Sequence, residues 1–169
     1  YYNLGLALFY QGKMEKAFDA FYKATWSNEQ QEMSFYYLAA IESGRGHYEA
    51  ALEFVNKGLV KNVHNIKARG LKAVILRKLG KQEEAKRQIE ENLKVDPFDF
   101  VSMFENALLE KDSPDALAEM NKRMRNFGES YLQAARDYAE SGNYEEAVAI
   151  LAQCTEEKPM LYYYKGYYL

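Results

Sequence analysis

The chain contains 169 residues, 48% of them apolar and 28% charged, so it is long enough to bury a core and too apolar to remain disordered. Its net charge of −3 argues against general nucleic-acid binding, which needs a basic surface. The single cysteine excludes an internal disulfide and a cysteine-rich zinc site, and no apolar run approaches the roughly 20 residues of a membrane span.

The first three pairs of predicted helices repeat every 34 residues. Four columns share this spacing: Gly12, Gly46 and Gly80; Ala17, Ala51 and Ala85; Gly5, Ala39, Ala73 and Ala107; and Phe21, Val55 and Ile89. The glycine supplies a left-handed cap that ends the first helix of a pair, and the alanine lets the second helix approach the first. Because such a hairpin cannot bury its apolar faces alone, it has to stack on its neighbours.

The fourth pair is shorter than the others. Ala107 and Ala135 are 28 residues apart, six fewer than the period, and the loop Asp112-Ser113-Pro114 has no glycine. A serine cap followed by proline still starts a helix well, so we expect a hairpin with shortened helices. A fifth pair turns at Gly142, and a sixth begins near Tyr162.

The caps and the period together predict an all-α chain with no strand. We expect first helices at about 1–11, 30–44, 65–79, 98–111, 129–141 and 159–169, and second helices at about 14–26, 48–60, 82–94, 114–126 and 144–156.

The pattern of these columns resembles the tetratricopeptide repeat (TPR). The opening Tyr1-x2-Leu4-Gly5-x2-Leu8 matches it with Tyr1 in place of the usual Trp and Leu8 in place of the usual Tyr. The resemblance implies a single right-handed superhelical solenoid of antiparallel helix hairpins. Its repeats would span about 1–31, 32–65, 66–99, 100–127 (degenerate), 128–158 and 159–169 (truncated).

A finer resemblance concerns the stretch from His64 to Leu79, together with the segments around Asp96-Pro97 and Pro159. They are similar to the C-terminal repeats of a bacterial family of large proteins, in which such repeats follow a β-sandwich of the sugar-mutarotase type. The chain also lacks an initiator methionine and starts inside a predicted helix. We therefore expect a fragment of a larger bacterial protein, of cytoplasmic or periplasmic location.

Residues with catalytic potential are few and scattered. His47 and His64 are separated by 17 residues, and neither belongs to a metal-binding motif. Solvent exposure is the favoured interpretation for His47, helix capping or solvent exposure for His64, and burial among small residues for Cys154. We expect no enzymatic activity, no cofactor and no metal.

First helices line the concave groove of TPR proteins, and the resemblance places our candidate partner-binding residues there. They are Tyr2, Phe9, Tyr36, Tyr37, Lys67, Val74, Arg77 and Lys78. Arg136, Tyr163 and Tyr167 occupy groove-facing positions of later repeats. Some TPR domains bind an acidic C-terminal tail through a carboxylate clamp of five residues. Only Lys67 matches one of these five positions, so this function is not expected here.

Two interpretations of the basic segment 61–87 remain open. Its nine Lys and Arg residues could pair with the acidic residues that follow on neighbouring helices. Alternatively, Lys67, Arg77 and Lys78 could stay free in the groove and attract an acidic, partly apolar segment. Gly70 inside a helix fits either close helix packing or close approach of a partner.

The expected function is a protein–protein interaction scaffold that binds a protein or peptide partner, or a neighbouring domain, in the concave groove, with no nucleic acid or membrane partner. The alternative is an accessory helical-repeat domain of a larger carbohydrate-active protein, since exposed tyrosines also suit sugar stacking. The helix at 159–169 lacks its second helix, so self-association through it is a further expectation.

Overall fold

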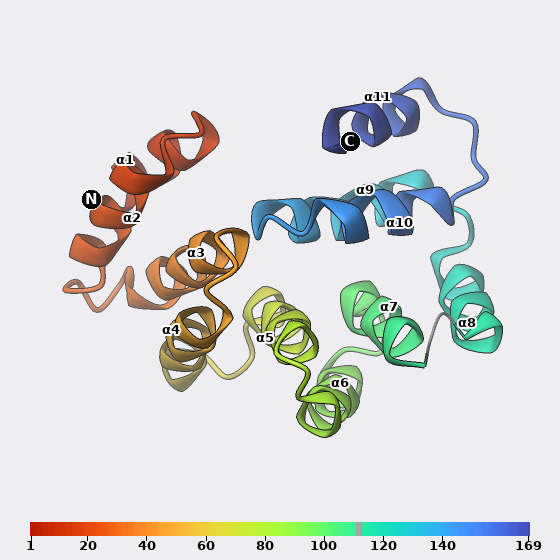
Figure 1. The fold of residues 1–169 in the computed structure, drawn as a ribbon, viewed down its shortest axis with the longest axis horizontal. Coiled ribbons are helices and arrows are strands. Elements are labelled where there is room, and N and C mark those ends of the chain that lie inside the picture. Colours follow the sequence, from red (N-terminus) through yellow and green to blue (C-terminus); the bar gives the residue numbers. More distant parts are fainter. Residues whose placement is uncertain (111–112) are drawn as a thin grey trace.

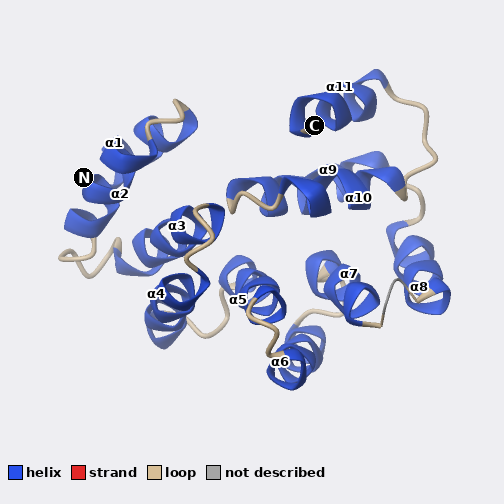
Figure 2. Ribbon diagram, viewed as in Figure 1, coloured by secondary structure: helices blue, strands red, loops and turns tan. Residues whose placement is uncertain are grey.

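A computed structural model describes residues 1–110 and 113–169, and within them the chain forms eleven helices and no strand (Figures 1 and 2). The helices are α1 (Tyr2–Tyr10), α2 (Met14–Ala24), α3 (Gln31–Gly44), α4 (Tyr48–Lys61), α5 (Ile66–Lys78), α6 (Gln82–Val95), α7 (Phe100–Leu109), α8 (Pro114–Met124), α9 (Gly128–Glu140), α10 (Tyr144–Ala152) and α11 (Pro159–Tyr168). The all-α solenoid prediction is confirmed. None of the described helices is long and apolar enough to cross a membrane.

Glycine turns close four of the hairpins in the same way. Gly12, Gly46, Gly80 and Gly142 have φ between 73° and 77°, which a residue with a Cβ adopts only under strain. At the first turn, Gly12 N–H donates to the Phe9 carbonyl and Lys13 N–H to the Leu8 carbonyl, both at 2.9 Å. These bonds satisfy the carbonyls at the end of α1 and direct the chain back into α2.

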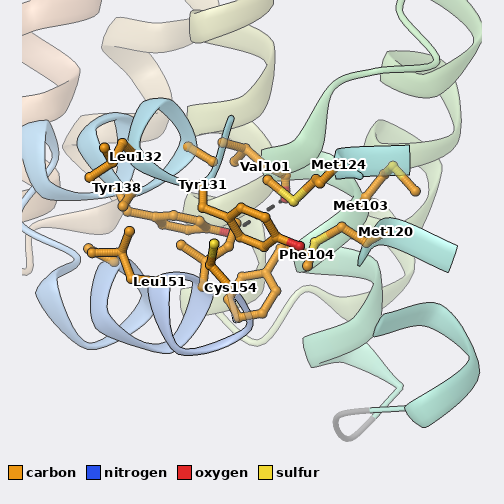
Figure 3. Close-up of a cluster of buried hydrophobic side chains, with 14 of the residues drawn as sticks. Val101, Met103, Phe104, Met120, Met124, Tyr131, Leu132, Tyr138, Leu151 and Cys154 are labelled. Atoms are coloured by element: carbon orange, nitrogen blue, oxygen red, sulfur yellow. Dashed lines mark hydrogen bonds between the residues drawn. The ribbon is translucent and has the colours of Figure 1, made fainter. Parts of the chain in front are cut away.

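The hairpins pack into two apolar cores. The alanines of the periodic column, Ala17, Ala51 and Ala85, are fully buried where paired helices cross. A Cβ added at Gly5 would lie 2.7 Å from the Phe21 ring, so α1 and α2 approach closely there. The first core belongs to α1–α5 and the second to α5–α11, and Figure 3 shows the second around Tyr131 and Tyr138.

The fourth hairpin consists of α7 and α8 and changes the direction of the chain. Ser113 caps α8 by accepting the Ala116 N–H at 3.4 Å, with Pro114 at the first helical position. Residues Lys111 and Asp112, at the end of the expected first helix and in its loop, lie outside the described residues. After α8, in the connection to the next repeat, Arg125 and Asn126 both adopt φ of 53°, and they are the non-glycine residues of the described chain with a positive φ.

The chain curls back on itself after this hairpin. The helices α1 to α8 follow an arc, and α9 and α10 lie inside that arc (Figure 1). As a result α9 contacts α5 as well as its expected neighbours α7, α10 and α11. The last second helix, α10, ends at Ala152, whereas the sequence predicted about residue 156.

Candidate partner-binding groove and cleft

The structure places half of the predicted groove residues in the core. Tyr36, Tyr37, Val74 and Phe9 are buried, and Tyr2 is partly exposed. The Tyr37 ring stacks on Phe21 at a centroid distance of 4.8 Å and meets Phe9 edge to face at 5.2 Å. These aromatic rings therefore pack α1, α2 and α3 together.

The three predicted cations all have carboxylate partners. Lys67 Nζ lies 2.8 Å from Glu140 Oε2 and 3.2 Å from Asp137 Oδ1, both on α9. Lys78 Nζ lies 2.5 Å from Glu146 Oε1 on α10. The pairing interpretation therefore describes these side chains, although most of their partners come from repeat five and not from the next helices along the chain.

Arg77 is the most enclosed of these cations. Its guanidinium donates to both oxygens of Glu105, at 2.6 and 3.1 Å, and to Glu146 Oε1 at 2.7 Å. Glu105 is completely buried and also accepts the Tyr138 hydroxyl at 2.8 Å. This network joins α5, α7, α9 and α10.

Burial and pairing shift the pKa values of this network in opposite directions. Burial acts to lower the pKa of Lys67, but Asp137 and Glu140 raise it above its ordinary value. Burial acts to raise the pKa of Glu146, but hydrogen bonds from Lys78 and Arg77 bring it below its ordinary value. For Asp137, burial outweighs the attraction of Lys67 and the pKa is raised. Lys67 interacts with two carboxylates, so it stays charged while Asp137 is only partly compensated.

A cleft of about 540 Å³ lies beside this network, between the first repeats and the last. Its aromatic lining comes from both walls: Phe9 and Tyr10 on α1, Tyr144 on α10, and Tyr164, Tyr167 and Tyr168 on α11. Tyr10, Tyr144 and Tyr167 are exposed. Its volume falls within the range of about 300–1,000 Å³ that is usual for ligand sites.

The charges that line the cleft leave one cation available. Glu140 is nearly buried and already holds Lys67 and the Tyr36 hydroxyl. Arg45 pairs with Glu15 at 2.7 Å and with Glu42 at 2.5 Å. Arg136 is exposed and has no carboxylate within salt-bridge distance among the described residues. The cleft therefore combines tyrosine rings with one unpaired guanidinium.

The histidine and cysteine side chains singled out by sequence lie apart from the cleft. His47 Nδ1 lies 2.8 Å from Glu42, and Cys154 is buried beside Asn126. No cluster of three or more His, Cys, Asp or Glu side chains suited to a metal ion occurs among the described residues.

Comparison with protein families finds matches at three of the repeats described above. The family model described as tetratricopeptide repeat matches residues 1–31, 66–99 and 128–159, which together make up more than half of the chain. The chain belongs to the tetratricopeptide repeat family. None of the curated proteins compared with this TPR chain matches it.

Solved TPR structures share the fold at low sequence identity. A TPR protein from Parabacteroides merdae has a TM-score of 0.67 and 20% identity, covering 98% of this chain and 68% of its own. TTC0263, a thermophilic TPR protein of Thermus thermophilus, has a TM-score of 0.66 and 21% identity, covering 99% of this chain and 94% of its own. YrrB, described as a TPR protein with an unusual peptide-binding site, has a TM-score of 0.63 and 16% identity, covering 98% of this chain and 90% of its own.

Only some of the TPR positions singled out by sequence lie in the cleft. Phe9, Arg136 and Tyr167 line it, and Tyr37 stands behind it, with its hydroxyl 3.5 Å from that of Tyr10. Tyr10, Tyr144 and Tyr164 were not predicted. The high tyrosine content near the end of the chain is a signal for them, but which rings face the cleft depends on how α9 to α11 turn back.

Proposed function

We propose that this TPR chain is a scaffold that binds a short segment of a partner protein in the aromatic cleft between its first and last repeats. The observation that carries the proposal is the cleft itself. Large aromatic side chains remain exposed there on both walls, whereas carboxylates of α9 and α10 already pair with the cations of repeats two and three.

The lining suits a peptide for two physical reasons. Tyrosine rings offer a large contact area at a low entropy cost, because each ring has only two rotatable bonds to order. Arg136 supplies a charge that can orient a carboxylate or a row of backbone carbonyls. The partner segment would lie between Tyr10 on one wall and Tyr167 on the other.

Of the predicted patch of Tyr2, Tyr36, Tyr37, Lys67, Val74, Arg77 and Lys78, three residues contact side chains that line this cleft, namely Tyr36, Tyr37 and Lys67. Tyr37 packs against Phe9, which lines the cleft, and Lys67 neutralises Glu140 at its floor. Tyr36, Tyr37 and Val74 are buried, and Lys67 is paired with carboxylates of α9, which limits direct contact of a partner with these side chains. We therefore expect these residues to act mainly through the shape and charge of the cleft.

The peptide-binding site named in the description of YrrB belongs to that protein, and it supports the choice of a peptide here. Self-association through α11 and a carbohydrate-active parent protein stay predictions. The second rests on the resemblance of His64 to Leu79 and the segments around Pro97 and Pro159 to repeats that follow a mutarotase-like domain. Exposed tyrosines suit sugar rings as well as peptides, and the charge of Arg136 favours the peptide.

The test starts from a peptide selected against the chain by phage display. Tyr10→Ala and Tyr167→Ala, from opposite walls, should each weaken its binding by about 1–2 kcal/mol, the size of an interface hot spot. Arg136→Gln should slow association with an acidic peptide and reduce its salt dependence. Calorimetry and stopped-flow fluorescence measure these effects.

The matched control is Tyr22→Ala, an exposed tyrosine on α2 that does not line the cleft. It should leave the affinity unchanged. Selected peptides that bind all of these variants equally well would show that the cleft is not the binding site.

A further inference from the structure

One edge of the solenoid carries large apolar side chains in contact with solvent. Ile66, Phe98 and Phe127 are 43%, 62% and 55% exposed. They stand at or just before the starts of α5, α7 and α9, where one repeat passes into the next. The opposite edge consists of the glycine turns, such as Gly46 and Gly80, within the hairpins. Grouped exposed apolar side chains on one edge are typical of an interaction surface.

These three side chains line one hollow of about 420 Å³ at the beginnings of α5, α7 and α9. Phe100, Val101 and Ala134 add to its apolar lining. Phe98 and Phe100 meet edge to face at a centroid distance of 6.4 Å, which holds the ring of Phe98 at the rim. The hollow has room for a few residues of an extended segment.

All the charged residues that line this hollow in the described chain are acids, namely Asp96, Asp99, Glu129 and Asp137. Burial raises the pKa of Asp99 and of Asp137 above the ordinary value. Asp99 is held by Ser102 and Asp137 by Lys67, yet these contacts do not fully offset their loss of water. The apolar walls therefore surround negative charge that an added cation would stabilise.

Lys158, a cation of the chain itself, already binds at the rim of the hollow in the way that we expect of a partner's cation. Lys158 Nζ lies 5.5 Å from the centre of the Phe127 ring and 3.2 Å from Glu129 Oε1. The ammonium group thus uses an aromatic face and a carboxylate at the same time. Phe98 and Asp96 offer the same two groups on the other side of the hollow, where no ion pair of Asp96 is found among the described residues.

We infer that this hollow binds a partner segment in which a Lys or Arg side chain lies next to an aromatic or aliphatic one. The apolar side chain enters between Phe98, Phe127 and Ile66, and the cation reaches Asp96. The surface is separate from the tyrosine cleft and has the opposite charge preference, because the unpaired side chain of the cleft is Arg136.

The experiment uses two fluorescein-labelled peptides, KFRFK and EFDFE, whose binding is followed by fluorescence anisotropy. KFRFK should bind about tenfold more tightly, because only its charges complement the hollow. Phe98→Ser and Asp96→Asn should each weaken KFRFK binding about fivefold or more. Asp96→Asn keeps the oxygen that accepts the Phe98 N–H at 2.9 Å, so it removes the charge and not the turn.

Val60→Ser is the control on the same edge, since Val60 is exposed but lies outside the hollow, and Tyr167→Ala is the control in the cleft. Both should bind KFRFK as the unchanged chain does, with circular dichroism reporting the fold of every variant. Equal binding of the two peptides overturns the inference, as does full KFRFK binding by Phe98→Ser. Loss of binding in Tyr167→Ala also overturns it, because the peptide then occupies the cleft.

Discussion

At the scale of single residues, Arg77 joins distant parts of this chain through its contacts with Glu105 and Glu146. Glu105 is completely buried, and its carboxylate is compensated by two hydrogen bonds from Arg77 and one from the Tyr138 hydroxyl. Arg77 in turn reaches Glu146, which lies 69 positions further along. A buried ion pair contributes little relative to apolar residues, but removing one partner leaves an uncompensated charge.

Arg77→Met should therefore lower the free energy of unfolding by about 3–5 kcal/mol, since Glu105 is left without its cation. Urea denaturation followed by circular dichroism measures the change. Arg123→Met is the control, because Arg123 is exposed, pairs with Glu119 at 2.8 Å and donates to the Pro97 carbonyl at 2.9 Å, all in contact with solvent, so its loss should cost only about 1 kcal/mol or less. Similar stabilities for the two variants would contradict the role assigned to Arg77.

At the scale of the elements, the connection from α8 to α9 differs from the other described connections between repeats, which have no residue with a positive φ. Arg125 and Asn126 both lie in the left-handed region, and neither is glycine. Asn126 is held there because its side-chain oxygen accepts the Thr155 N–H at 2.8 Å. Arg125 is exposed, and no side-chain hydrogen bond of Arg125 is found in the described part of the chain.

Arg125→Gly should accordingly stabilise the chain by about 0.5–1 kcal/mol, because the strain of a side chain in the left-handed region exceeds the entropy cost of glycine. Lys122→Gly, one turn earlier and inside α8, should destabilise it by about 1 kcal/mol. Thermal or urea unfolding gives both values. The same sign for the two substitutions would show that Arg125 carries no backbone strain.

The elements could be predicted from the sequence because their causes are local. A glycine at φ of 73° ends a helix wherever it occurs, and Ala17, Ala51 and Ala85 are buried because each faces its own hairpin partner. The partners of Lys67 could not be predicted in the same way. They depend on the direction of α9, which follows a connection where two non-glycine residues, Arg125 and Asn126, adopt the left-handed conformation.

The whole molecule is closed by repeat five resting on repeat two. Asn143 and Ser43 lie within 3.4 Å, and the Tyr36 hydroxyl donates to Glu140 at 3.0 Å, across 104 positions. A Cβ added at Gly142 would lie 2.5 Å from the Cα of Gly44. This contact brings the two walls of the tyrosine cleft together, so the proposed binding site depends on it.

Comparing Gly142→Ala with Gly46→Ala tests this closure most directly. Both glycines have a positive φ, 73° and 77°, but a Cβ at Gly46 meets open space. Each substitution should cost about 1–2 kcal/mol of unfolding free energy from backbone strain. Gly142→Ala should cost about 1–3 kcal/mol more, because its methyl group is forced against the backbone of α3. Equal losses for the two variants would mean that repeat five does not rest on repeat two, and the cleft as described would not exist.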